Sequence, residues 1–169
     1  MSAITLGIIG GGQLGSMLAI AAKKLGINTI VFCDDKDAPA QNFCDKFINS
    51  EYNDNNNIIE FVSQVDLVTY EFENIPYETL NEINKLKTVL PKPSVNRLIQ
   101  HRLAEKDFIN KLNIRTTRYV SIEKKSDIET LADFLPGILK TTTMGYDGKG
   151  QYPIKKIEDI YSLNIDFSK

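Results

Sequence analysis

The chain has 169 residues, of which 42% are hydrophobic and 25% are charged, and its formal net charge is −2. These values are ordinary for a folded protein of one or two domains, and they give no reason to expect nucleic acid as a partner. The N-terminus lacks a basic segment before an apolar one, and no apolar run has membrane length, so no membrane is expected either. Cys33 and Cys44 have no metal-ligand spacing and are expected to be reduced thiols, which favours a cytoplasmic protein.

The first part of the chain has the pattern of an α/β fold with a parallel sheet. Short apolar runs bounded by polar residues or glycine predict strands at residues 4–9, 28–32, 46–48, 65–70 and 88–90. Apolar residues at helical spacing predict helices at residues 13–25, 58–64 and 76–86. In the first helix these apolar residues are Leu14, Met17, Leu18, Ala21, Ala22 and Leu25, and Gly26 is placed to end it. We expect a Rossmann-like open sheet whose ligands bind beyond the carboxyl ends of its strands.

The pattern changes after Pro93, and we expect a first domain over residues 1–98 and a second over residues 99–169. In the second part, helices are predicted at residues 94–100, 103–112, 126–134 and 156–163, and strands at 119–122, 137–140 and 152–155. So few elements make a poor core for an independent domain, so we expect this part to be the beginning of a larger one.

A glycine-rich turn, Gly10-Gly-Gly-Gln-Leu-Gly15, lies between the first predicted strand and the first predicted helix. Backbone N–H groups at a helix N-terminus attract anions, which indicates a nucleotide or another phosphorylated small molecule. The alternative is a tight turn that needs glycine for packing. Asp34 and Asp35 end the second strand, where NAD enzymes hold a ribose-binding acid, so an NAD-dependent oxidoreductase stays open.

Two carboxylates, Glu71 and Glu73, follow the strand predicted at residues 65–70. They would point to the same side if the strand continued, and one of them can accept hydrogen bonds from an amine or from ribose hydroxyls. The alternative is a solvated strand end.

Arg102 lies on or just before a predicted helix and can reach a phosphate. The alternative is a charged helix face that Arg102 shares with Lys106. His101 is the only histidine of the chain, and we expect it at the surface.

A second glycine-rich segment, Gly145-Tyr-Asp-Gly-Lys-Gly-Gln151, lies between two predicted strands and has Lys140 before it. Glycine lets the backbone approach a ligand closely, and lysine neutralises phosphate charge. The spacing is not that of a P-loop. The segment therefore predicts a hairpin that covers the phosphates of a nucleotide, with a surface turn as the alternative.

Taken in their order along the chain, these motifs resemble the ATP-grasp enzymes of purine biosynthesis, and among them the N5-carboxyaminoimidazole ribonucleotide synthetase family. The resemblance rests on residues 10–15, 69–74, 102–106, 139–140 and 145–151, and it covers the whole chain. It implies a Rossmann-like pre-ATP-grasp domain followed by the first part of an ATP-grasp domain.

The resemblance also implies roles for individual residues. Gln13, Leu14 and Gly15 match the turn that holds the phosphate of aminoimidazole ribonucleotide. Glu73 and Tyr146 match residues beside this substrate, where the chemistry takes place. The ATP contacts match Arg102, Lys140, Gly145, Tyr146, Asp147, Gly148, Lys149, Gly150 and Gln151.

The reaction implied by the resemblance is a ligation that depends on ATP and Mg²⁺. ATP, bicarbonate and 5-aminoimidazole ribonucleotide give N5-carboxyaminoimidazole ribonucleotide, ADP and phosphate, through carboxyphosphate. Members of the family are often dimeric, so a homodimer is also implied. A non-catalytic nucleotide-binding module remains an alternative.

The chain departs from the family pattern in two respects. Ser16 stands where the family usually has arginine. The family's chains are about twice as long, and the part without a counterpart here holds the acidic Mg²⁺ ligands, so no residue of this chain is assigned to a metal. We therefore expect the chain by itself to be an inactive N-terminal fragment.

Overall fold

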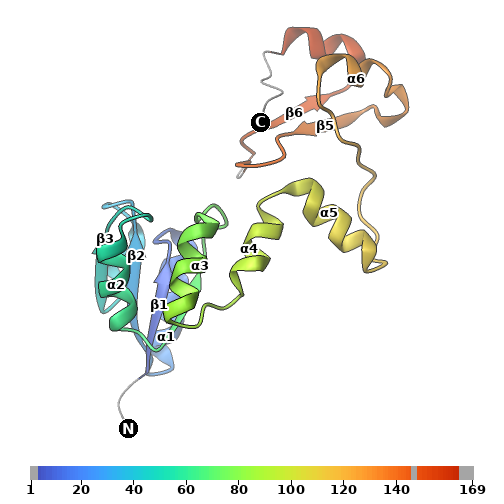
Figure 1. Cartoon of the computed structure of the whole chain (residues 1–169). Coiled ribbons are helices and arrows are strands. Elements are labelled where there is room, and N and C mark those ends of the chain that lie inside the picture. The colour runs from blue at the N-terminus through green and yellow to red at the C-terminus, as the bar shows by residue number, and fades with distance from the viewer. Residues whose placement is uncertain (1–3, 146–147, 164–169) are drawn as a thin grey trace. The chain divides into compact units, whose positions relative to one another are not determined.

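A computed structural model describes residues 4–145 and 148–163 of the chain. It contains two compact units, Met1–Arg97 and Leu98–Lys169, and each is described by itself (Figure 1).

The first unit is built on a four-stranded parallel sheet of strand order β3-β2-β1-β4. In register, Ile8 of the central strand stands opposite Val31 on one side and Thr69 on the other. This confirms the predicted parallel α/β fold. The strands are β1 (Thr5–Ile9), β2 (Asn28–Cys33), β3 (Lys46–Asn49) and β4 (Leu67–Tyr70). The strand predicted at residues 88–90 is reduced to one parallel bridge between Val68 and Val89, in which the Val68 N–H donates to the Thr88 carbonyl and the Leu90 N–H donates to the Val68 carbonyl.

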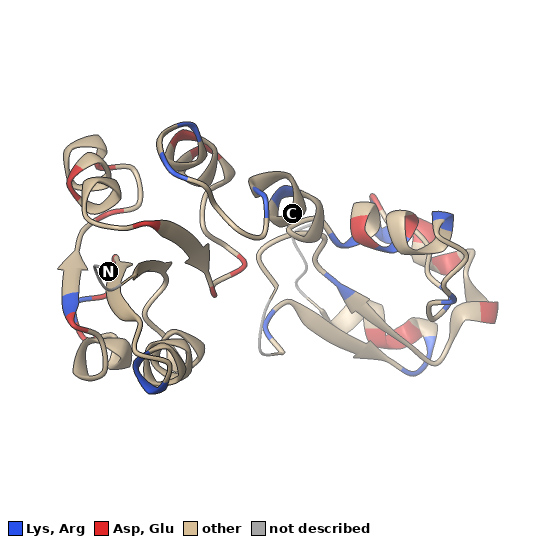
Figure 2. Ribbon diagram, turned by 90° about the horizontal axis from the view of Figure 1, so that it is seen from below, with Lys and Arg blue, Asp and Glu red and all other residues tan. Residues whose placement is uncertain are grey.

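Helices cover both faces of this sheet, as the view in Figure 2 shows. The helical elements are α1 (Gln13–Lys24), η1 (Pro39–Asn42), α2 (Asn55–Ser63), α3 (Tyr77–Leu86) and α4 (Pro93–Ile99). Alternate residues of each strand point to opposite faces, so β1 and β2 contribute to two cores. Ile9 and Phe32 pack with α2 and α3, whereas Ile8 and Val31 pack with α1 and η1. Leu80 and Ile83 of α3 are buried in the first core, as predicted.

Helix α1 buries a face made of small residues. Its buried positions are Gly15, Ser16, Ala19 and Ala22. The larger apolar residues Met17 and Leu25 are 57% and 76% exposed. The apolar spacing thus predicts the helix correctly but not its buried face, because a close approach to the sheet requires small side chains there.

Helix α2 begins earlier than predicted because Asp54 caps it. The Asp54 carboxylate accepts hydrogen bonds from the N–H groups of Asn56 and Asn57, at 3.0 and 3.1 Å. Further along the helix, Phe61 is fully buried, with its ring centroid 5.3 Å from that of Phe32. Gly7 of β1 makes room for it, since a Cβ there would lie 2.6 Å from the Phe61 ring.

The second unit contains one antiparallel strand pair with Leu139 opposite Tyr152, which confirms the predicted hairpin. Its small core joins Ile128, Ile154 and Ile160. The elements are α5 (Arg102–Lys111), α6 (Lys125–Glu129), η2 (Ala132–Phe134), β5 (Gly137–Lys140), β6 (Gln151–Ile154) and η3 (Ile157–Ser162).

One prediction for this unit is wrong, and two are correct only in part. Residues 119–122 form no strand, because they join no hydrogen-bonded ladder: the sheet of this unit consists of β5 and β6. The helix predicted at residues 126–134 ends at Glu129, where the next residue, Thr130, turns its hydroxyl back to the Asp127 carbonyl. The helix predicted at residues 156–163 is the short 3₁₀ helix η3, at whose start the Asp159 carboxylate accepts hydrogen bonds from the backbone N–H groups of Lys155 and Lys156.

Within the described part of the chain, none of the helices combines the length and the apolar character that crossing a bilayer requires.

The packing of Phe61 leads to a stability prediction. Replacing Phe61 by alanine should lower the free energy of unfolding by about 3 kcal/mol, because it leaves a cavity between α2 and the sheet. Ile59, on the same helix, is 59% exposed, so Ile59→Ala is the control and should change stability little. Urea unfolding followed by circular dichroism measures both, and equal losses would contradict the packing described above.

Candidate functional site

The glycine-rich turn of the first unit joins β1 to α1 by a close backbone approach. Gly10 has a φ of +99°, a conformation that favours glycine. A Cβ on Gly15 would lie 2.7 Å from the Gly10 carbonyl oxygen, so only glycine lets α1 start this close to the turn. The buried Ser16 continues this contact, since its hydroxyl donates to the Gly12 carbonyl at 3.0 Å. Ser16 therefore supports the turn from inside.

The carboxylate of Glu71 lies against the same turn. Its Oε1 accepts a hydrogen bond from the Gly12 N–H at 2.8 Å, and the Glu71 N–H donates to the Ile9 carbonyl at 3.1 Å. A Cβ on Gly10 would come within 2.9 Å of this carboxylate oxygen. The N-terminus of α1 therefore already faces one negative charge from within the protein.

The residues predicted to hold a phosphate open helix α1. Gln13 and Leu14 are exposed, whereas Gly15 is buried. The first N–H groups of a helix have no partner within the helix, so Gln13, Leu14 and Gly15 present donors on which an anion can bind.

The two carboxylates after β4 differ in their surroundings. Strand β4 ends at Tyr70, so the strand continuation that would place both on one side does not occur. Glu71 is partly buried against the glycine turn, whereas Glu73 is exposed in the turn that follows. Burial raises the pKa of the Tyr70 hydroxyl beside them.

Sequence reasoning missed Asn96, which supports this turn. Asn96 is fully buried, and its side-chain amide donates to the Ile75 carbonyl at 3.1 Å. It thereby ties the middle of α4 to the segment that carries Glu71 and Glu73. Its position in a short helix after Pro93 carries no sequence signal of this role.

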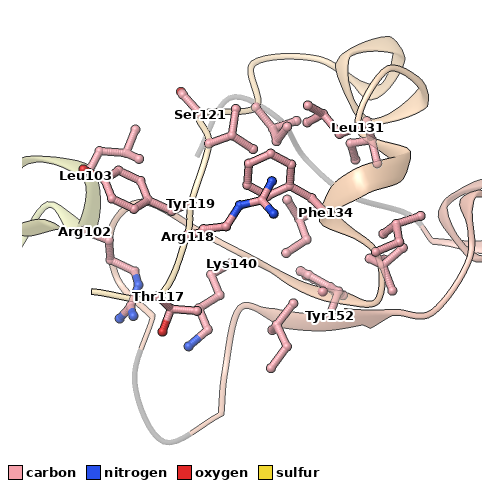
Figure 3. A pocket seen from close by; sticks show the side chains of 18 of the residues that line it. Arg102, Leu103, Thr117, Arg118, Tyr119, Ser121, Leu131, Phe134, Lys140 and Tyr152 are labelled. Atoms are coloured by element: carbon pink, nitrogen blue, oxygen red, sulfur yellow. The ribbon is translucent and has the colours of Figure 1, made fainter. Parts of the chain in front are cut away.

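The second unit contains a cavity of about 820 Å³ between α5, residues 117–122 and the β5–β6 pair (Figure 3). Most of its lining is apolar, and it includes Leu131, Leu135 and Phe134. Its only acidic lining residue among those described is Asp133. Its basic lining residues are Arg102, Lys106, Arg118 and Lys140. An apolar cavity with an excess of positive charge suits a ligand that has both a flat apolar part and an anionic part.

The structure brings two predicted ligand contacts, Arg102 and Lys140, to this one cavity. His101 caps α5, since its Nδ1 accepts a hydrogen bond from the Ala104 N–H at 3.4 Å. The Arg102 N–H donates to the Thr142 carbonyl at 2.9 Å, just beyond β5. This backbone bond holds the start of α5 beside the strand end that carries Lys140.

Arg118 was not singled out from the sequence. Its guanidinium lies 4.4 Å from the centre of the Phe134 ring, and both residues line the cavity (Figure 3). Lys106 lies 5.1 Å from the Tyr119 ring in a similar contact. The adjacent Arg118 and Tyr119 were the available signal, but the pairing of Arg118 with Phe134 depends on the fold.

The glycine-rich segment connects β5 to β6, where Lys140 stands opposite Gln151. The Thr141 N–H donates to the Gly150 carbonyl at 2.9 Å and closes the base of the segment. Gly148 and Gly150 have φ values of +81° and +66°. Gly145 and Lys149 belong to the same segment, but Tyr146 and Asp147 lie outside the described residues.

Over residues 4–145 and 148–163, no three His, Cys, Asp or Glu side chains are grouped so that they could hold a metal ion.

Comparisons with known proteins agree over both units. Residues 3–100 match the ribonucleotide synthetase preATP-grasp domain, and residues 107–167 match the ATP-grasp domain. The chain is 42% identical over 158 residues to the bifunctional purine synthesis protein purC/E of Dictyostelium discoideum, with 92% of this chain and 16% of that protein covered. It is 37% identical over 165 residues to the N5-carboxyaminoimidazole ribonucleotide synthase of Brucella melitensis, with 95% of this chain and 45% of that protein covered.

A solved structure is similar as well. The N5-carboxyaminoimidazole synthetase from Staphylococcus aureus, complexed with ADP, superposes with a TM-score of 0.86 at 34% identity, covering 94% of this chain and 43% of that one. The chain thus spans less than half the length of the synthases that it matches.

The glycine geometry predicts unequal effects at two positions of the second segment. Gly150→Ala should loosen the base of the segment, because the new Cβ would collide with the Thr141 side chain in addition to the strain of its positive φ. Gly148→Ala carries a similar strain of about 1 kcal/mol but meets no atom within 4 Å. Exchange of the Thr141 amide hydrogen should therefore be accelerated more by Gly150→Ala. Equal acceleration would contradict the collision.

Proposed function

The chain belongs to the ribonucleotide synthetase preATP-grasp family, and from this premise we propose that it forms the N-terminal part of an ATP-dependent carbon–nitrogen ligase of purine biosynthesis. Residues 1–98 are the pre-ATP-grasp domain and residues 99–169 are the beginning of the ATP-grasp domain. The reaction is the carboxylation of 5-aminoimidazole ribonucleotide with bicarbonate to N5-carboxyaminoimidazole ribonucleotide. The protein is proposed to work in the cytoplasm.

The observation that carries the proposal is the convergence of Arg102 and Lys140 on one cavity below a glycine-rich hairpin. The two cations suit the phosphates of ATP, and the apolar lining suits its base. The ADP in the complex of the similar Staphylococcus aureus synthetase supports this choice of nucleotide. Residues Gly145 to Gln151 would then cover the phosphates, with Lys149 adding a further positive charge.

The ribonucleotide is proposed to bind at the first unit. The N–H groups of Gln13, Leu14 and Gly15 are available for its phosphate at the start of α1. Glu73, exposed just beyond β4, is proposed to accept a hydrogen bond from the aminoimidazole ribonucleotide. Tyr146 is assigned to the same substrate.

The proposed roles of this chain's residues are binding, charge neutralisation and exclusion of water. Carboxyphosphate is hydrolysed readily, so a covering hairpin protects it until the amine of the ribonucleotide attacks its carbonyl carbon and phosphate leaves. The resemblance places the acidic Mg²⁺ ligands in the part of the family's chains that has no counterpart here. We therefore assign Mg²⁺ to no residue of this chain and derive no step through it.

The oxidoreductase alternative is weakened by Glu71. A dinucleotide fold needs the N–H groups of its glycine turn for a pyrophosphate, but here the Gly12 N–H is bound to the Glu71 carboxylate. An oxidoreductase with its dinucleotide at this turn would also leave the cavity of the second unit without a role. The other alternative, a non-catalytic nucleotide-binding module, differs from the ligase because it needs to bind only one of the two ligands, ATP or 5-aminoimidazole ribonucleotide.

A homodimer is also proposed, from the exposed face of α1. The exposed apolar residues are Leu14, Met17 and Leu18 of the helix and Leu25, which caps its C-terminus. Exposed apolar faces of this kind are typical of protein contacts.

Sedimentation velocity tests the dimer. The chain should show a mass that rises with concentration, and Met17→Lys should remain monomeric because a charge enters the apolar face. Ile59→Lys, at an equally exposed position of α2, is the control and should dimerise like the unchanged chain. A chain that is monomeric throughout would overturn this part of the proposal.

Ligand binding to the 169-residue chain tests the main proposal. ATP and 5-aminoimidazole ribonucleotide should each raise its melting temperature, whereas NAD should not. Lys140→Ala and Arg102→Ala should each weaken ATP binding about tenfold, from the loss of about 1.5 kcal/mol of charged hydrogen bonding.

The matched control is Lys111→Ala, which removes an exposed lysine of α5 that does not line the cavity. Isothermal titration calorimetry should give the same ATP affinity for this variant as for the unchanged chain. Stabilisation by NAD alone, or equal weakening by all three alanine variants, would contradict the assignment.

A further inference from the structure

The carboxylate of Glu71 lies at the N-terminus of α1 and has no role in the ligase reaction proposed above. Helix α1 has no acidic residue in its first turn, and its N-cap residue, Gly12, has no side chain to cap it. A carboxylate reaches this helix end from the residue after β4, more than fifty residues along the chain: Glu71 accepts a hydrogen bond from the Gly12 N–H at 2.8 Å.

The turn is shaped around this carboxylate. Glu71 atoms are the nearest neighbours that a Cβ on Gly10 or Gly12 would meet, at 2.9 and 3.2 Å. A Cβ on Gly15 would lie 3.4 Å from the same oxygen. Three of the four glycines of the turn, Gly10, Gly12 and Gly15, therefore leave space beside Glu71, and the backbone bond from Glu71 to Ile9 fixes the position from which its side chain reaches the turn.

We propose that Glu71 is a specificity-determining residue of the glycine-rich turn: it holds the Gly12 N–H, admits a single phosphate at the N–H groups of Gln13 to Gly15, and rejects a diphosphate. The inference rests on the proposed function for the presence of a phosphate at α1. It goes beyond that function by assigning to Glu71 the choice between a monophosphate ester and a dinucleotide.

The physical reason is competition for donors together with repulsion. A pyrophosphate spread over the turn would need the Gly12 N–H, which Glu71 already occupies, and would bring its charge against the carboxylate. A monophosphate needs only the donors of the first helical turn. The Glu71 carboxylate still repels a bound monophosphate. The monophosphate therefore binds more weakly than it would beside a neutral residue.

Nuclear magnetic resonance of the ¹⁵N-labelled 169-residue chain tests this with inorganic phosphate as the probe. Phosphate should shift the amide signals of Leu14 and Gly15 and leave that of Gly12 in place, because its hydrogen bond to Glu71 persists. Glu71→Gln keeps an oxygen acceptor for Gly12 but removes the charge, and should bind phosphate about tenfold more tightly. The same variant should gain measurable affinity for pyrophosphate.

The control is Glu78→Gln, which removes the same charge from an exposed position in the first turn of α3. It should bind phosphate as the unchanged chain does, so a general charge effect would be recognised. Glu71→Ala should lose the protection of the Gly12 amide against hydrogen exchange, which Glu71→Gln should retain. If the role of Glu71 were purely structural, Glu71→Ala would still lose this protection. Glu71→Gln would then bind phosphate with the same affinity as the unchanged chain.

Two results overturn the inference. One is a Gly12 signal in the unchanged chain that moves with those of Leu14 and Gly15, since phosphate would then displace Glu71; this result needs no variant. The other is phosphate affinity in Glu71→Gln no higher than in the unchanged chain. The proposed function fails differently, by an absence of any phosphate-induced shift in the unchanged chain while ATP still binds the second unit.

Discussion

The close approach of α1 to the end of β1 is the constraint on which the first unit depends. Without a side chain on Gly15, the helix starts against the Gly10 carbonyl, and a face of small residues then packs on the sheet. The same approach leaves the larger apolar residues of α1 exposed and brings the helix N-terminus to the end of β4. Glu71 completes the arrangement by placing a negative charge at the positive end of the helix dipole.

The second unit gathers its charged residues by a different route. Arg102 begins a helix, Arg118 lies in a segment without regular structure, and Lys140 ends a strand, yet all three line one cavity. The backbone bond from Arg102 to Thr142 and the contact of Arg118 with Phe134 hold two of these positions. In such a cavity the cations are spaced by the fold, so that one anionic ligand can meet several of them.

Local sequence patterns correctly predicted the elements that depend on neighbouring residues in the chain. The hairpin around the glycine-rich segment follows from strand patterns on both sides, and the parallel sheet follows from alternating strands and helices. The prediction failed at residues 119–122, because a strand requires a partner that the local pattern does not specify. It also failed where a side chain ended a helix, as Thr130 does after α6.

The sequence by itself determined the α/β class, the family motifs and most of the residues proposed to meet phosphate. Glycine spacing and apolar periodicity are local properties, so they can be recognised in the sequence without knowledge of the fold. Only the tertiary structure decided that Glu71, rather than its neighbour Glu73, turns into the glycine motif, and that Arg118 joins Arg102 and Lys140. These are contacts between distant segments, and their geometry depends on how closely the backbone elements can pack.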